Sequence, residues 1–125
     1  MNKQMKIFLT FVAAVVVLGG VLGWFMFKQS PTATVTADTI LFYGEECPHC
    51  KDVDKFLADN KIADKVRYDS VEVWHNKDNA ALMLQKAKEC GLAEDAVGVP
   101  FAWSEGKCFI GTPDVEALFK EKAGL

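Results

Sequence analysis

Two cysteines separated by two residues carry the most evident chemistry in this sequence. They lie in the run 46–51 (ECPHCK), directly after the apolar segment 39–43 and directly before an amphipathic helical pattern. This order predicts a strand, a short loop and a helix that starts at Cys47. The free N–H groups and the dipole of a first helical turn favour an anion, so the thiolate of Cys47 should be stabilised there. Pro48 suits the first helical position because its φ is fixed and it has no N–H to leave unpaired.

His49 and Cys50 complete the predicted catalytic motif. A protonated His49 would stabilise the thiolate further, and Cys50 is placed to attack a mixed disulfide on Cys47 and release the substrate. A CxxC pair can also be half of a zinc site, whose remaining ligands would have to come from three isolated residues, Cys90, Cys108 and His75. The strand-then-helix context favours the redox interpretation. An inert pair is disfavoured because a helix start is an exposed place, and no metal site is predicted.

The rest of the chain supplies the elements that would position this motif. A buried strand is predicted over 39–43, and a helix over 48–60 with an apolar stripe at Cys50, Val53, Phe56 and Leu57. Alternation predicts a second strand over 65–73. A second helix should be capped by Asn76 or Asp78 and run to Cys90, with Gly91 as its left-handed stop.

The last third of the chain predicts a hairpin and a helix. Val99-Pro100 leads into a strand at 101–103, a turn at 104–107 and a returning strand at 108–110. Thr112 is expected to cap the last helix, with Pro113 at its first position and its end at Gly124. The order β-α-β-α-β-β-α predicts an α/β fold, a four-stranded mixed sheet covered on both faces.

Charge is distributed unevenly along the 125 residues. Three lysines and no acid precede residue 38, which leaves 11 of the 14 basic residues against all 17 acidic residues and a net charge of −6 beyond that point. An acidic domain of this kind is a poor candidate for nucleic-acid binding. A monomer is expected.

Residues 7–27 contain no charged side chain and predict a transmembrane helix. At about 1.5 Å per residue they span a hydrocarbon core of roughly 30 Å, with Trp24 suited to the interface. The amino terminus, Lys3 and Lys6 outweigh Lys28, so the N-terminus is expected in the cytoplasm and the rest on the extracytoplasmic, periplasmic side. The expected organisation is a membrane anchor at 1–28, a linker at 29–37 and a domain at 38–125.

Two other interpretations of the apolar segment were weighed. A cleaved signal peptide would use 35–37 (VTA), which lies about ten residues beyond an apolar run that is itself longer than a usual signal core. A buried core helix would not be so uniformly apolar. An uncleaved signal anchor is favoured, and either signal exports the domain, where four cysteines suit an oxidising compartment.

The sequence resembles the thioredoxin-fold superfamily in its minimal, glutaredoxin-like form. The resemblance covers about residues 38–123 and rests on the CPHC motif after the first strand, on Val99-Pro100 and on Gly111. It implies that the Val99–Pro100 bond is cis, faces the cysteines and pairs with an extended substrate peptide. The alternative is an ordinary proline at a strand start.

The motif itself looks like that of the periplasmic disulfide-forming oxidases called DsbA, but this chain has no room for their helical insertion. Leu41 replaces the buried acid that such proteins carry in the first strand, so proton transfer at Cys50 would use Glu45, Glu46, Lys51 or water. The second glycine of the glutaredoxin glutathione site is also absent from the run 111–114 (GTPD). Specific glutathione binding is therefore not expected, and no cofactor is predicted.

Cys90 and Cys108 form the second cysteine pair. A bridge between them would stabilise the domain by roughly 3 kcal/mol through loop closure. Two buried free thiols and a second redox pair are the alternatives.

The sequence as a whole predicts an enzyme: a membrane-tethered, extracytoplasmic thiol–disulfide oxidoreductase that acts on cysteines of exported proteins and exchanges electrons with a membrane or extracytoplasmic redox partner. The direction of electron flow is left open. A tethered copper or zinc carrier that uses the thiolates of Cys47 and Cys50 is the alternative, and a fold-only adaptor is a third hypothesis.

Overall fold

The computed structural model describes residues 2–26 and 33–125, which belong to two compact units, Met1–Pro31 and Thr32–Leu125. The described part of the first unit is a single helix, α1 (Lys3–Met26). Its segment Lys3–Val21 has a mean hydropathy of 2.0 and no buried residue, so α1 is long and apolar enough to cross a membrane, a test that a signal sequence also passes. The side chain expected at the interface, Trp24, and residue 27 lie outside the described part of the structure.

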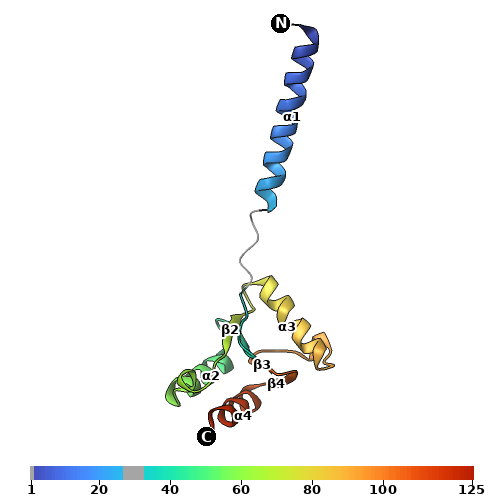
Figure 1. Ribbon diagram of the computed structural model, residues 1–125. Coiled ribbons are helices and arrows are strands. Elements are labelled where there is room, and N and C mark those ends of the chain that lie inside the picture. The colour runs from blue at the N-terminus through green and yellow to red at the C-terminus, as the bar shows by residue number, and fades with distance from the viewer. Residues whose placement is uncertain (1, 27–32) are drawn as a thin grey trace. The chain divides into compact units, whose positions relative to one another are not determined.

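The second unit is a thioredoxin-like α/β fold built on a four-stranded mixed sheet (Figure 1). The strands lie in the order β2-β1-β3-β4, with β1 and β2 parallel and the other pairs antiparallel. The elements in chain order are β1 (Thr39–Tyr43), α2 (Pro48–Asp59), the 3-10 helix η1 (Ile62–Asp64), β2 (Asp69–Glu72), α3 (Lys77–Glu89), the 3-10 helix η2 (Glu94–Ala96), β3 (Phe101–Ser104), β4 (Lys107–Ile110) and α4 (Thr112–Ala123). The predicted fold class is confirmed.

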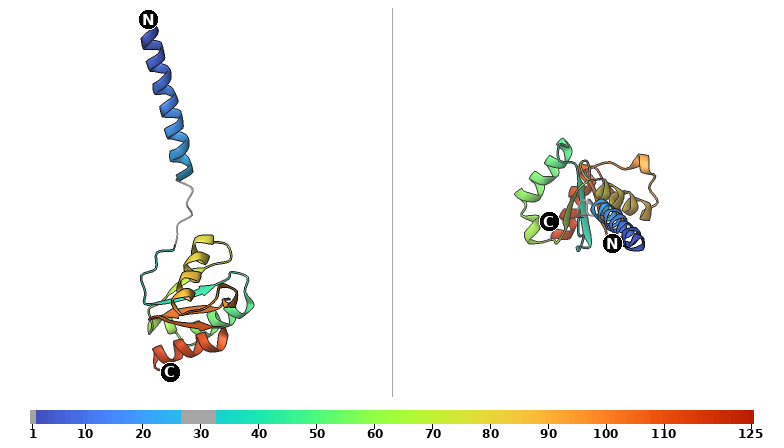
Figure 2. Two further views of the ribbon diagram at one scale, coloured as in Figure 1. Left: turned by 90° about the vertical axis from the view of Figure 1, so that its right-hand side faces the viewer. Right: turned by 90° about the horizontal axis from the view of Figure 1, so that it is seen from above.

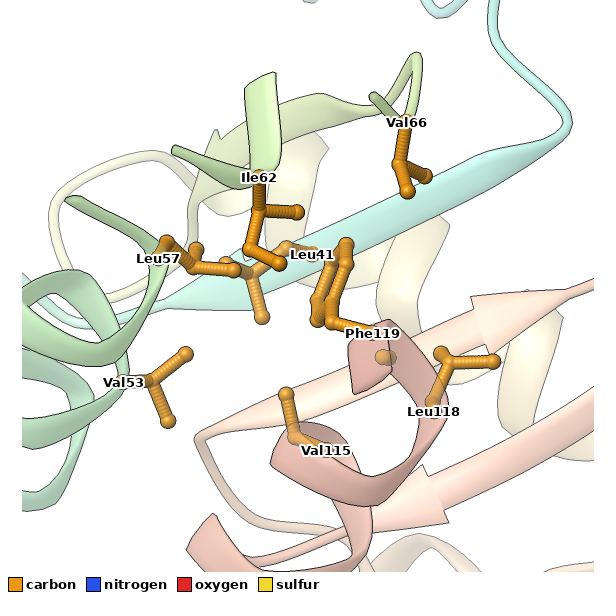
Figure 3. Close-up of a cluster of buried hydrophobic side chains, with 9 residues drawn as sticks. Leu41, Val53, Leu57, Ile62, Val66, Val115, Leu118 and Phe119 are labelled. Atoms are coloured by element: carbon orange, nitrogen blue, oxygen red, sulfur yellow. The ribbon is translucent and has the colours of Figure 1, made fainter. Parts of the chain in front are cut away.

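The sheet separates two hydrophobic cores, because successive side chains of a strand point to opposite faces. Leu41 of β1 joins the core under α2 and α4, which includes Val53 and Phe119 (Figure 3). Its neighbours Ile40 and Phe42 join the core under α3 on the other face. Figure 2 shows α3 on the opposite side of the sheet from α2 and α4. The active-site helix is therefore fixed by the first of these cores.

Strand β2 is shorter than the sequence predicted. The expected strand over 65–73 reduces to Asp69–Glu72, which pairs with residues 40–43 of β1. The N–H groups of Lys65 and Val66 instead donate to the carbonyl of Ile62, at 2.9 and 2.8 Å, and are not available to a ladder. The apolar alternation before Asp69 therefore reflects loop residues that pack on the core, as Val66 does.

The start of the last helix also differs from the prediction. Gly111, with φ of 87°, is the N-cap, and Thr112 is the first residue of α4 rather than its cap. Pro113 consequently follows one position later than expected. The second helix is capped by Asn76, one of the two predicted candidates, whose side chain accepts from Asp78 and Asn79 N–H.

Residues 33–37, which the sequence analysis assigned to the linker, belong to the second unit and are bonded to it. The Asp69 carboxylate accepts the N–H groups of Thr36 and Ala37, both at 2.7 Å, and the Asn79 side chain accepts the N–H of Ala33 at 3.2 Å. These bonds hold the chain along the domain before it enters β1.

Cys90 and Cys108 are joined by a disulfide in this structure, with their Cα atoms 6.2 Å apart. Cys90 ends α3 and Cys108 lies in β4, so the bridge connects the helix of one face to the edge strand of the sheet. The loop that it closes contains the Val99–Pro100 bond.

Candidate functional site: a dithiol at the start of a helix

Cys47 is the N-cap residue of α2, directly before Pro48. Its Sγ accepts the backbone N–H of Cys50 at 3.2 Å, and its own N–H donates to the carbonyl of Gly44 at 3.1 Å. A side chain that accepts an N–H of the first turn satisfies one of the four donors that a helix leaves free. The same donor and the helix dipole would stabilise a thiolate on Cys47.

Cys47 and Cys50 are both free and both buried, with exposed fractions of 3% and 2%. Burial raises the pKa of the Cys50 thiol to about 12, helped by its hydrogen bond with Cys47, while the Gly44 backbone acts in the opposite direction. Cys50 is therefore a protonated thiol at neutral pH.

The Val99–Pro100 peptide bond is cis, and it lies beside Cys47. Cys47 Sγ is 3.9 Å from the carbonyl oxygen of Val99. Pro100 is buried, and its carbonyl accepts the N–H of Gly111 at 2.9 Å, which fixes this loop to the start of α4. The structure thus brings together the residues that the sequence analysis assigned to catalysis and to substrate binding.

His49 is the exposed member of the motif. Its Nδ1 lies 3.9 Å from Asp52, with both side chains mostly exposed, and its carbonyl accepts a bond from the Thr112 hydroxyl at 3.4 Å. Within residues 33–125 the structure gives no hydrogen bond between the His49 ring and either sulfur. The role predicted for His49 in tuning the thiolate stays a prediction.

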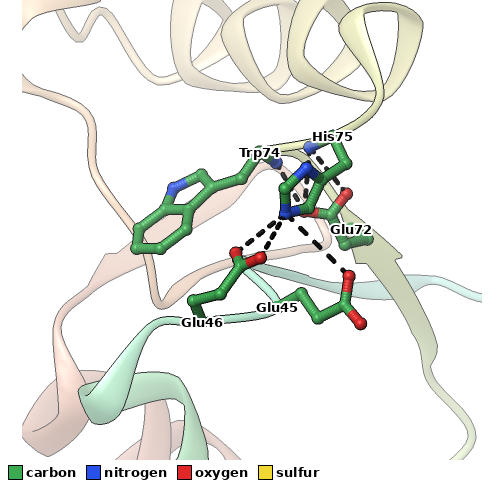
Figure 4. Close-up of polar contacts among 5 residues, drawn as sticks. All are labelled: Glu45, Glu46, Glu72, Trp74 and His75. Atoms are coloured by element: carbon green, nitrogen blue, oxygen red, sulfur yellow. Dashed lines mark hydrogen bonds and ion pairs between the residues drawn. The ribbon is translucent and has the colours of Figure 1, made fainter.

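The loop after β2 is a part of the site that the sequence analysis missed. His75 Nε2 lies 2.6 Å from a carboxylate oxygen of Glu46, and Glu72 accepts the N–H groups of Trp74 and His75 (Figure 4). The hydrogen bond with Glu46 raises the pKa of His75. The sequence did contain one indication of this contact. Two parallel strands were predicted, and the carboxyl ends of the parallel strands β1 and β2 lie at the same edge of the sheet.

A second residue that the sequence analysis missed is Asp54, one helical turn after Cys50. Its charge contributes to the raised pKa of the Cys50 thiol, and partial burial raises the pKa of Asp54 itself. The i, i+4 spacing on the predicted helix could have identified it. Asp54 joins Glu45, Glu46 and Lys51 as a candidate to exchange protons with Cys50.

Glu45, Glu46 and His75 are the residues of the described structure that could hold a metal ion together, since their ligand atoms lie within 4.8 Å of one another. All three are exposed, and the His75–Glu46 ion pair accounts for the cluster without an ion. This cluster includes neither Cys47 nor Cys50.

Comparisons with known proteins give structural likeness alone: no family model and no curated protein matches the chain. Among solved structures, a glutaredoxin of Archaeoglobus fulgidus is 19% identical over 69% of this chain and 85% of its own, with a TM-score of 0.49. Oxidised glutaredoxin 2 of Chlamydomonas reinhardtii is 23% identical over 70% and 83%, with a TM-score of 0.48. Wheat glutaredoxin is 23% identical over 69% and 72%, also at 0.48. Since each TM-score is below 0.5, the fold assignment rests on the element order and register described above.

Fold and site together define a thioredoxin-like α/β domain that carries a free dithiol at a helix start, opposite a cis-proline loop. The chain that holds this domain begins with a helix that could span a membrane.

Proposed function

We propose that this protein is a membrane-tethered thiol–disulfide oxidoreductase that acts on cysteines of exported proteins. The observation that carries the proposal is the placement of Cys47 at the N-cap of α2, with its Sγ bonded to Cys50 N–H and 3.9 Å from the Val99 carbonyl. Cys47 as the nucleophile, Cys50 as the resolving thiol and the Val99 backbone as the site that pairs with the substrate would then lie next to one another.

The chemistry in the reducing direction follows from this arrangement. The thiolate of Cys47 attacks one sulfur of a substrate disulfide, a mixed disulfide forms, and the other substrate sulfur leaves as a thiolate that takes up a proton. Cys50 then loses its proton and attacks the Cys47 sulfur. The substrate thiol is released, and a Cys47–Cys50 disulfide forms. The substrate disulfide has been reduced by two electrons, and the Cys47–Cys50 dithiol has been oxidised by two. Oxidation of a substrate dithiol is the reverse.

The high pKa of Cys50 gives the two cysteines different tasks. A thiol with a pKa of about 12 is a poor nucleophile at neutral pH, so it does not compete with Cys47 for the incoming disulfide. Proton removal from Cys50 is then required for release, and the acids near the start of α2 are the candidate acceptors. Val99 would pair with the backbone of the substrate segment that carries the cysteine.

The second cysteine pair disfavours the metal-carrier alternative. A closed thiolate metal site would need ligands beyond Cys47 and Cys50. Cys90 and Cys108 are bonded to each other and offer no further thiolates.

The membrane tether and its orientation are part of the proposal. The length and hydropathy of α1 support an anchor, and the lysines at positions 3 and 6 support a cytoplasmic N-terminus with the catalytic domain on the extracytoplasmic side. A redox partner in the membrane or outside it would recycle the dithiol.

Trapping of mixed disulfides tests the proposed function. The Cys50→Ser variant of the full chain, expressed in its membrane, should accumulate disulfide-linked adducts with exported proteins, because release is blocked, whereas Cys47→Ser should give none. Adducts that form equally in both variants, or in neither, would contradict the proposal. The reduction potential of Cys47–Cys50 in the wild type then assigns direction: about −120 mV indicates a disulfide donor and about −270 mV a reductant.

A further inference from the structure

Trp74 is exposed at the catalytic end of the domain and is held there. Among residues 33–125, Trp74, at 52% exposure, and the terminal Leu125 are the exposed large hydrophobic side chains. Glu72 accepts the Trp74 N–H at 2.6 Å, and His75 next to it is bonded to Glu46. The backbone that carries this exposed indole is fixed by Glu72, so it loses little further conformational freedom when a ligand binds.

The indole lies against the backbone of Gly44. A Cβ at Gly44 would collide with the Trp74 ring, so the close approach depends on glycine. Gly44 also accepts the N–H of Cys47 through its carbonyl, at 3.1 Å. Gly44 thus contacts both the exposed ring and Cys47, which places the ring on the side of the dithiol.

The surroundings of Trp74 are negatively charged. Glu45 and Glu46 have side chains that are 72% and 59% exposed, while one histidine, His75, lies between them (Figure 4). His75 Nε2 is 2.6 Å from Glu46 but 3.9 Å from Glu45, so Glu45 is the less compensated charge. An anionic ligand would be repelled here and a cationic one attracted.

The other tryptophan of the domain shows what such a ring accepts. Lys86 Nζ lies 3.9 Å from the centroid of the Trp103 ring, a cation–π contact within the chain. Within the described residues no lysine or arginine occupies Trp74 in this way. Trp74 is therefore an exposed cation–π acceptor in negatively charged surroundings.

We propose that Trp74 binds a lysine or arginine side chain next to the cysteine of the substrate polypeptide, so that the preferred substrates are basic around their reactive cysteine. The aliphatic stem and cationic head would lie on the indole, and the negative charge of Glu45 and Glu46 would attract the head. This inference rests on the proposed oxidoreductase function and specifies its substrate class. Trp74 is a positioning residue in this scheme, because it does not touch the reacting sulfurs.

Exchange rates with matched peptides test the proposal. The reduced full chain in mild detergent is mixed with short peptides in which one cysteine is flanked by Lys, Ser or Glu and carries a chromogenic thiol as a mixed disulfide. A small neutral disulfide without amino-acid side chains serves as the reference substrate. The wild type should react with the Lys peptide at least about fivefold faster than with the Ser peptide, and slowest with the Glu peptide.

Four variants separate the contributions. Trp74→Ala should reduce the ratio of the Lys-peptide rate to the Ser-peptide rate about three- to fivefold and leave the rate with the neutral disulfide unchanged. Glu45→Gln should lower the same ratio, which is measured relative to the neutral disulfide because Glu45 is also a candidate proton acceptor for Cys50. Trp74→Phe should retain part of the preference. Glu121→Gln, which removes the same charge from the far end of α4, should change nothing.

Each outcome decides one of the two proposals. Equal rates for the three wild-type peptides, or a preference that survives Trp74→Ala, refute the basic substrate class and leave the oxidoreductase intact. A wild type that exchanges with none of the peptides and not with the neutral disulfide refutes the oxidoreductase, and the substrate class with it. Rates that fall in Trp74→Ala for all substrates alike show a structural role of the ring and refute recognition.

Discussion

Replacing both Cys90 and Cys108 by alanine should lower the free energy of unfolding of the domain by about 3 kcal/mol. The two residues are 18 positions apart in the sequence, and the bridge removes the freedom of that loop from the unfolded chain. The chain-entropy relation gives a loss of about 11 cal/mol/K for a loop of this length, which is about 3 kcal/mol at 25 °C. This is a large share of the 5–15 kcal/mol typical of a small domain.

The measurement is equilibrium unfolding in urea of the full chain in mild detergent, followed by the near-ultraviolet circular dichroism of the buried aromatic side chains. The matched control is Cys47→Ala with Cys50→Ala, which removes two sulfurs that are not bonded to each other. Adding a thiol-free reductant to this control should reproduce the full loss, since the Cys90–Cys108 bridge is then the remaining disulfide. The same reductant should not affect the Cys90→Ala, Cys108→Ala variant.

A loss below about 1 kcal/mol in the bridge variant would refute the reasoning, because loop closure would then not contribute to stability. An equal loss of stability in the control variant, Cys47→Ala with Cys50→Ala, would also refute the reasoning. The effect would then come from the removal of packed sulfur and not from the cross-link.

Three further results are expected. By NMR, the pKa of His75 should lie above the usual 6.5, and Glu46→Gln should return it to the usual value. Because the folded pKa is raised, the ion pair stabilises the domain below the unfolded pKa, and this contribution is lost as pH rises through the folded pKa. A stability cost of Glu46→Gln that does not depend on pH would contradict the ion pair. Mass spectrometry should find Cys50 unmodified by iodoacetamide at about pH 8, with Asp54→Asn shifting its modification to lower pH; a readily modified Cys50 would contradict its high pKa. Leu41→Ala should cost about 2–5 kcal/mol in urea unfolding, and a cost below about 1 kcal/mol would show that this core does not hold α2.

The sequence was sufficient to predict the fold because its local signals agree with one another. The CxxC run after an apolar strand placed Cys47 at a helix start, and the hairpin turn at 104–107 fits a loop in which Glu105 and Gly106 both have positive φ. The prediction was wrong where apolar residues alternate without being a strand, as in residues 65–68, since alternation reports burial and not the partner of the backbone N–H.

The surroundings of the dithiol were less predictable. Trp74 and His75 approach the motif only through the pairing of β1 with β2, and nothing in their spacing from Cys47 indicates the contact. The pKa of Cys50 likewise depends on burial, which a helical stripe suggests but does not measure. Contacts between residues that are distant in the sequence could therefore not be predicted from the sequence pattern.

Gly44 has a consequence for mutational tolerance. It has no side chain to contribute to catalysis, yet its carbonyl holds Cys47, its backbone contacts the Cys50 thiol, and its missing Cβ makes room for Trp74. The backbone groups remain in any substituted residue except for the N–H of proline, so most substitutions act through a Cβ that displaces the Trp74 ring. In a saturation screen, substitutions at Gly44 should therefore behave like variants of Trp74, and proline should in addition disturb the dithiol.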